Sequence, residues 1–211
     1  MSSETARQRP TELRPAWVSD EEYPFESRYL TINNCCVHYI DEGAGPSILM
    51  LSGNPFWSFV YRRIVLGLRE TFRCIAPDYL GFGLSVAPLG YDFRPATHAR
   101  VIETFVERQR LSGWTLMAND WGGPIGLWVA GRHPDQVRSL VLGNTWAWPA
   151  EHRDRALRMF STVVGGPLGD LLVKRLNIFL NVFVARGMGG RRPSSGALRA
   201  YKGPFPTSAS R

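Results

Sequence analysis

The stretch that decides the fold is Thr115-Leu-Met-Ala-Asn-Asp120-Trp-Gly-Gly-Pro-Ile125. Residues 114–118 are apolar and predict a buried strand, and residues 122–130 show helical spacing after two glycines. An aspartate, Asp120, therefore stands where the chain turns sharply from a strand into a helix. Ala118, Asp120 and Gly122 give the pattern small-X-Asp-X-Gly, in which small residues allow a strained turn to approach its neighbours closely. This pattern typifies a turn that presents a nucleophile.

The surroundings of Asp120 also favour a reactive carboxylate. A helix that begins near Trp121 would direct its free amides and the positive end of its dipole toward the carboxylate, which favours the ionised form. A second interpretation is that Asp120 only caps this helix, because aspartate is a favoured N-cap residue. The nucleophile gains support upstream, where residues 47–51 predict a buried strand that is followed by Ser52-Gly-Asn-Pro-Phe-Trp-Ser58. The loop after this strand could supply hydrogen-bond donors beside Asp120.

Four segments of the chain, in order and spacing, resemble the haloalkane dehalogenases. They are Ser52-Gly-Asn-Pro-Phe-Trp-Ser58, residues 72–85, Asn119-Asp-Trp-Gly-Gly123 and residues 137–149. The resemblance implies an α/β-hydrolase fold, with a mostly parallel sheet flanked by helices and the start of a helical cap. Strands near 47–51, 72–76, 114–118 and 137–142 alternate with helices near 58–69, 95–109 and 122–132, which also indicates parallel pairing. We expect an N-terminal lead over residues 1–26, a core over 27–149 and an incomplete cap segment over 150–211. Within the cap segment, apolar positions such as Leu157 and Phe160 would form cap faces, residues 186–195 would be flexible and residues 201–211 would form a loop.

The resemblance assigns roles to three residues. Asp120 would displace the halide and form an alkyl-enzyme ester, while the side-chain amide of Asn54 and the indole N–H of Trp121 stabilise the leaving halide. Preorganised donors accelerate such a step because the halide gains charge in the transition state. The backbone N–H groups of Asn54 and Trp121 would hold the oxyanion when the ester is hydrolysed. The structural alternatives are a turn residue before Pro55 for Asn54 and core packing for Trp121.

The second half of the reaction raises a difficulty. Hydrolysis of the ester needs a histidine base oriented by an acid, and both follow the nucleophile in this fold. Only His133 and His152 follow Asp120, and neither has a suitable context: His133 stands at a helix end, where a charge role suits it, and His152 opens a charged segment. Some family members carry the acid as a glutamate after the strand at 137–142, where this chain has Asn144 and Trp146. We therefore expect the acid, the base and the last strands to be missing, which leaves the strand at 137–142 at the edge of the sheet.

Three functional hypotheses remain open from the sequence. The first is haloalkane dehalogenase chemistry, reduced in this chain to its first half. The second is epoxide hydrolysis, and Asn54 argues against it. A leaving halide needs this donor, whereas epoxide openers rely on cap tyrosines, and the cap segment offers only Tyr201. The third is a non-catalytic remnant, supported by the missing base and by Ser52, which stands where the family usually has histidine.

Composition bounds the partners. The chain has 211 residues, is 44% hydrophobic and carries a net charge of +7, but its C-terminal arginines are spaced among apolar residues and glycines. This distribution favours a solvated surface over a nucleic-acid site. No uninterrupted apolar run of about 18 residues predicts a membrane span, and the start lacks an apolar signal core, so a cytoplasmic protein is expected. The cysteines lack metal-ligand spacing. We expect a small haloalkane and water as reactants, with no cofactor and no metal; the sequence leaves the oligomeric state open.

Overall fold

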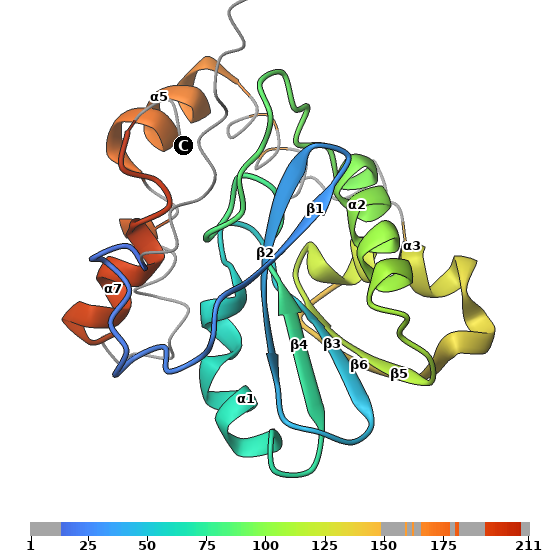
Figure 1. The fold of residues 1–211 in the computed structure, drawn as a ribbon. Coiled ribbons are helices and arrows are strands. Elements are labelled where there is room, and N and C mark those ends of the chain that lie inside the picture. Colours follow the sequence, from blue (N-terminus) through green and yellow to red (C-terminus); the bar gives the residue numbers. More distant parts are fainter. Residues whose placement is uncertain are drawn as a thin grey trace, which may run out of the picture.

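The structure is a computed structural model that describes residues 14–148, 159, 162, 166–177, 180–181 and 193–207. Its centre is a six-stranded sheet in the order β1-β2-β4-β3-β5-β6 (Figure 1). The strands are β1 (Arg28–Ile32), β2 (Cys35–Glu42), β3 (Ser47–Leu51), β4 (Arg73–Pro77), β5 (Trp114–Asn119) and β6 (Val137–Gly143). All of the strands expected from the sequence are present, with ends that differ by about one residue.

The pairing of the strands is mixed. The strands β4, β3, β5 and β6 pair in parallel, whereas β1 pairs with β2 and β2 pairs with β4 in antiparallel fashion. The predicted α/β class with a mostly parallel sheet is thus confirmed. In the register of β3 and β5, Leu51 lies opposite Ala118, so both strands end side by side. The loop after β3 and the turn after β5 consequently meet at the carboxyl ends of these parallel strands, where ligands bind in open α/β sheets.

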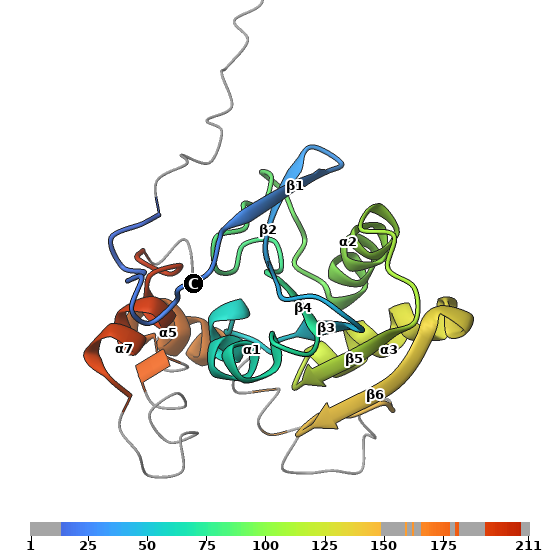
Figure 2. The ribbon, with the colours of Figure 1, turned by 60° about the horizontal axis from the view of Figure 1, so that its bottom comes forward.

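Helices cover both faces of the sheet (Figures 1 and 2). The short η1 (Ser58–Tyr61) leads into α1 (Arg62–Leu68) on one face, and α2 (Pro95–Arg108) and α3 (Gly122–Arg132) lie on the other. These helices confirm the three that the sequence predicts. The remaining described helices are η2 (Pro134–Gln136), α5 (Pro167–Leu176) and α7 (Ser195–Lys202).

The core has two layers because successive side chains of a strand point to opposite faces. Along β3, Leu49 and Leu51 pack into the cluster that contains the apolar side chains of α2 and α3. The neighbouring residues Ile48 and Met50 pack into the cluster on the side of η1 and α1. Burial on both faces explains why the central strands read as continuous apolar runs.

The strand β6 lies at one edge of the sheet, as the sequence predicts. Its side chains Leu140, Val141 and Leu142 are 48%, 48% and 43% exposed. In the described part of the chain, apolar side chains on this strand therefore remain accessible to solvent, which is unusual for a parallel strand.

Parts of the expected lead and cap pack on the same face as η1. Tyr23 and Tyr201 belong to one buried cluster with Trp57, whose indole N–H donates to the carbonyl of Ala200 at 3.1 Å. Because α7 extends to Lys202, residues 201 and 202 are helical, and the loop expected from residue 201 starts later. The boundaries expected at residues 26 and 149 stay a prediction. Expected cap positions such as Leu157 and Phe160 lie outside the described residues, as do residues 186–192 of the segment expected to be flexible.

Among the described helices, none has both the length and the apolar character that a membrane crossing requires.

The buried His98 of α2 should make stability depend on pH. Its ring nitrogen Nδ1 lies 3.1 Å from the hydroxyl of Tyr91, and burial lowers the pKa of His98 to about 4. Between about pH 6.5 and this value the unfolded chain binds a proton that the folded chain does not, so stability falls as the pH falls. We expect a loss of at most about 3 kcal/mol across this window. Urea unfolding at several pH values should show a smaller loss for His98→Gln, and equal slopes for both proteins would contradict the assignment.

Candidate active site

Asp120 occupies a strained position between β5 and α3. Its φ of +51° lies in the left-handed region, which residues with a side chain seldom adopt. Three hydrogen bonds hold this conformation: the N–H of Asp120 donates to the carbonyl of Asn144 at 3.0 Å, and the carbonyl of Asp120 accepts from the Thr145 hydroxyl at 2.6 Å and from the N–H of Gly123 at 3.1 Å. The segment that follows β6 thereby fixes the turn that presents the carboxylate.

Glycines around the turn allow backbones to approach closely. A Cβ on Gly53 would overlap the side chain of Asp120, and a Cβ on Gly122 would overlap the carbonyl group of Leu51. A Cβ on Gly123 would overlap the side chain of Thr145. The three glycines are therefore required by space, which is the physical reason for the small-residue pattern seen in the sequence.

The structure brings Asn54 against Asp120. The backbone N–H of Asn54, in the loop after β3, donates to Oδ1 of Asp120 at 3.1 Å. The Asn54 residue is exposed, whereas Asp120 is half-buried. An amide that the sequence assigns to the oxyanion thus already points at the carboxylate, and two segments separated by 66 positions form one site.

Trp121 follows Asp120 directly and precedes the first residue of α3. Its side chain is 38% exposed, and its ring lies 5.0 Å from the ring of Trp146 in an edge-on arrangement. Trp146 also lines an open, mostly apolar groove with Pro124, Leu127, Trp128, Ala147 and Trp148. The indole beside Asp120 is therefore in contact with an accessible apolar surface.

The sequence did not single out two residues that shape this site, Thr145 and Tyr61. The hydroxyl of Tyr61 lies 2.8 Å from the carbonyl of Leu51 and 2.9 Å from Oδ1 of Asn119. One feature of the sequence could have pointed to Thr145. It directly follows a predicted parallel strand, and the residues that follow such strands lie at the same end of the sheet as Asn54 and Asp120. Tyr61 carries no comparable signal, because an aromatic residue at helical spacing reads as core.

His38 is fully buried in a polar network on β2. Its Nδ1 lies 2.8 Å from Oδ2 of the equally buried Asp78, and its Nε2 lies 3.1 Å from the hydroxyl of Ser27. Asp78 also accepts the N–H groups of Ser58 at 2.8 Å and Leu84 at 2.9 Å. The His38–Asp78 pair therefore joins β2 to the start of η1, which directly follows the loop that carries Asn54, and its role is structural.

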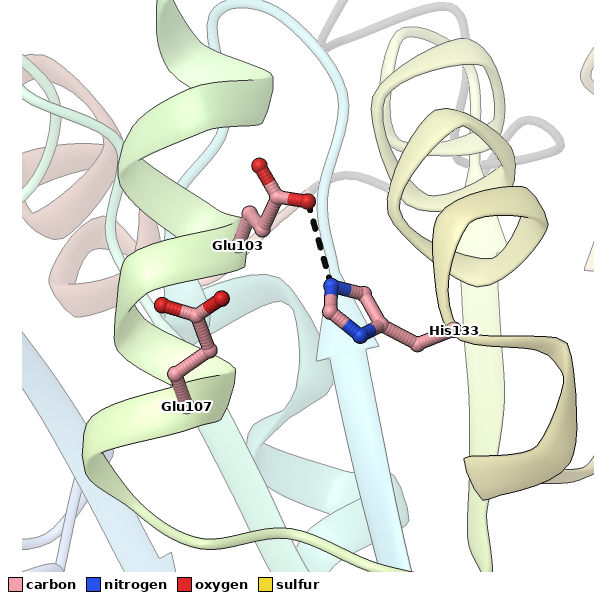
Figure 3. Close-up of side chains that lie close together, drawn as sticks. All are labelled: Glu103, Glu107 and His133. Carbon is pink, nitrogen blue, oxygen red and sulfur yellow. Dashed lines mark hydrogen bonds and ion pairs between the residues drawn. The ribbon is translucent and has the colours of Figure 1, made fainter.

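His133 follows the last residue of α3 and pairs with α2 (Figure 3). Oε1 of Glu103 accepts from Nε2 of His133 at 3.1 Å and from Nε of Arg132 at 2.6 Å. Although partial burial acts to raise it, these two partners lower the pKa of Glu103 below its usual value. Glu107 lies near both residues, with one ligand atom from each of the three within 4.8 Å of the others. Since Arg132 already neutralises Glu103, the cluster is better described as an ion pair between helices than as a metal site.

The described histidines are all engaged away from Asp120. His38 contacts Asp78, His98 contacts Tyr91 and His133 contacts Glu103. His152 lies outside the described residues. Within the part of the chain that the structure describes, no histidine is hydrogen-bonded to the carboxylate at the turn.

Comparisons with known proteins agree with the fold described above. Residues 46–202 match the family described as the alpha/beta hydrolase fold. Over 189 residues the chain is 46% identical to haloalkane dehalogenase 2 of Mycobacterium tuberculosis. The aligned region covers 90% of this chain and 65% of that protein. A cis-3-alkyl-4-alkyloxetan-2-one decarboxylase of Shewanella oneidensis is 35% identical, over 89% of this chain and 60% of that protein.

Solved structures extend the comparison. The haloalkane dehalogenase DatA of Agrobacterium tumefaciens superposes with a TM-score of 0.79 at 26% identity, over 88% of this chain and 64% of that one. The chain spans 65% of the length of the mycobacterial dehalogenases that it matches. Three findings agree: the match to the family model, the order of the strands and the aspartate at the turn. The chain therefore belongs to the α/β-hydrolase fold family, and within that family it is similar to haloalkane dehalogenases.

Proposed function

We propose that Asp120 displaces halide from a haloalkane. A carboxylate oxygen attacks the carbon that carries the halogen, a C–O bond forms, the carbon–halogen bond breaks and the halide leaves with the electron pair. The observation that carries this proposal is the strained turn that presents Asp120 to the loop after β3, with the Asn54 N–H 3.1 Å from its carboxylate. A nucleophile held at a fixed angle reacts faster because its orientation is set before the substrate arrives.

The leaving halide would be stabilised by the Asn54 side-chain amide and the Trp121 indole N–H. Both are neutral donors on segments that meet at Asp120, so they can favour a developing anion without forming an ion pair with the carboxylate. The backbone N–H groups of Asn54 and Trp121 would hold the oxyanion during ester hydrolysis.

The alkyl ester should accumulate on the chain. Its hydrolysis needs a base that activates water, and each described histidine is bound to a group other than Asp120. Displacement can therefore occur once per molecule while the second step stays slow. The proposed reactants remain a haloalkane and water, and the proposal includes neither a nucleic acid nor a membrane partner.

The test is intact-protein mass spectrometry after incubation with bromobutane, paired with measurement of released bromide. One butyl group per chain and one equivalent of bromide would support displacement that stops at the ester. Bromide released over many turnovers without an adduct would show that a base acts in this chain. Neither adduct nor bromide would favour the non-catalytic remnant.

Replacement of Asn54 by alanine should slow formation of the adduct. The variant keeps the backbone N–H that contacts Asp120 and removes only the side-chain amide, so it isolates the halide donor. We expect the barrier to rise by about 2 to 3 kcal/mol, as for loss of other preorganised donors. Time-resolved mass spectrometry with bromobutane measures this rate, and an unchanged rate would contradict the role of the amide.

A second candidate function comes from the relative in Shewanella oneidensis, whose name describes decarboxylation of an oxetanone. Ring opening of such a lactone by a carboxylate would resemble halide displacement, with a carboxylate as the leaving group. Incubation with a dialkyl oxetanone separates the two functions, because decarboxylation releases carbon dioxide and dehalogenation releases halide.

Epoxide hydrolysis is less well supported. Tyr201, the tyrosine expected to open an epoxide, is only 5% exposed and its hydroxyl lies 3.4 Å from the guanidinium of Arg62. Its ring also packs against those of Phe56 and Phe59. A tyrosine held in this way donates poorly to a substrate at Asp120.

A further inference from the structure

Tyr61 joins the two segments that carry the proposed site. It ends η1, is 5% exposed, and places its hydroxyl 2.8 Å from the carbonyl of Leu51 and 2.9 Å from Oδ1 of Asn119. Leu51 is the last residue of β3 and leads into the loop of Asn54, while Asn119 is the last residue of β5 and precedes Asp120. One side chain thus contacts the residues that begin both halves of the site.

The chemistry of the three groups allows a complete network. A tyrosine hydroxyl has one proton and can also accept, whereas the Leu51 carbonyl can only accept. Rotation of the Asn119 amide would present its NH₂ group to the Tyr61 oxygen while Tyr61 donates to Leu51. Burial raises the pKa of Tyr61 far above its usual value, so the hydroxyl keeps its proton at any ordinary pH. Leaving these buried groups unpaired would be costly.

The Leu51 carbonyl lies where small displacements matter. It is the group that a Cβ on Gly122 would overlap, so it already packs directly against the start of α3. Asn144 and Thr145 hold the turn from the side of β6, and Tyr61 holds it from the side of β3. The carboxylate is therefore positioned between two sets of hydrogen bonds.

We propose that Tyr61 is a positioning residue for displacement: its hydroxyl sets Asp120 relative to Asn54 by joining the ends of β3 and β5. This inference rests on the proposed function of Asp120. Loss of the hydroxyl would leave the nucleophile intact but less well aligned, and misalignment slows the attack without weakening substrate binding.

The test compares Tyr61→Phe with Tyr79→Phe in the full chain. Tyr79 is also buried, and after burial itself the charges of Tyr61 and Asp120 raise its pKa, so it lies near the site. Its hydroxyl has no hydrogen-bond partner within the described residues, so Tyr79→Phe removes a nearby buried hydroxyl that does not join β3 to β5. With bromobutane we expect Tyr61→Phe to lower the saturating alkylation rate about tenfold with a half-saturation concentration unchanged within about twofold. Tyr79→Phe should retain the rate of the unmodified chain, and urea unfolding checks that both variants are folded.

A double-mutant cycle tests whether Tyr61 acts through Asn119. If it does, Asn119→Ala slows alkylation, and adding Tyr61→Phe to it slows the reaction less than Tyr61→Phe does alone. Fully additive effects would contradict the action through Asn119. A rate for Tyr61→Phe equal to that of Tyr79→Phe would overturn the positioning role altogether.

Hydrogen exchange separates this inference from the proposed function. Tyr61→Phe should accelerate exchange of the amides of Asp120, Gly123 and Asn54, and Tyr79→Phe should not. If the unmodified chain forms no adduct but Tyr61→Phe shows this local effect, the proposed displacement fails while the structural coupling stands. If adduct forms and neither rate nor exchange responds to Tyr61→Phe, the positioning role fails and displacement stands.

Discussion

Replacement of Asp120 by alanine should abolish the butyl adduct formed with bromobutane. The carboxylate is the atom group that forms the new C–O bond, so its removal eliminates the reaction instead of slowing it. Because Asp120 has a φ of +51°, alanine also adds backbone strain, and Asp120→Asn is the better matched variant since asparagine tolerates this region. Intact-protein mass spectrometry should detect no adduct for either variant.

Peptide mapping of the chain without substitutions, after its incubation with bromobutane, completes this experiment. The butyl group should lie on the peptide that contains Asp120, and alkaline hydrolysis should release it as expected for an ester. An adduct of equal yield in Asp120→Asn, or a butyl group found on one of the three cysteines, would contradict the assignment of Asp120.

Among the substitutions proposed for this chain, Gly122→Ala should cause the largest decrease in the free energy of unfolding. The added Cβ would overlap the backbone carbonyl of Leu51, and neither partner can rotate away as a flexible side chain can. We expect a loss of at least about 3 kcal/mol, in the range that marks steric conflict in a packed interior. Urea unfolding followed by circular dichroism measures this difference.

Gly131→Ala is the matched control for this change. Gly131 lies in the same helix, α3, but a Cβ there would meet nothing within 4 Å. Alanine favours a helix over glycine by about 1 kcal/mol, so Gly131→Ala should be neutral or stabilising. An equal loss of stability at the two positions would contradict the contact with Leu51 as the cause of the loss at Gly122.

Much of the fold is predictable from short stretches. Apolar runs such as residues 47–51 and 114–118 predict strands, the spacing in residues 95–109 predicts a helix, and the structure has these elements with nearly the same ends. These features depend on side-chain periodicity and on local backbone preferences, which neighbouring residues determine. The start of the loop expected from residue 201 is wrong, because Tyr201 and Lys202 still belong to α7. Gly203 and Pro204 favour a turn at their own positions, and this preference does not extend to the two residues before them.

The sequence by itself determined that Asp120 stands in a sharp turn between a strand and a helix, because the pattern Ala-X-Asp-X-Gly is local. Only the tertiary structure decided which groups meet there. The contacts of Asn54, Tyr61 and Thr145 with this turn depend on the register of β3, β5 and β6, which bring distant segments to one edge of the sheet. Register follows from packing of the whole sheet against its helices, and no single segment encodes it.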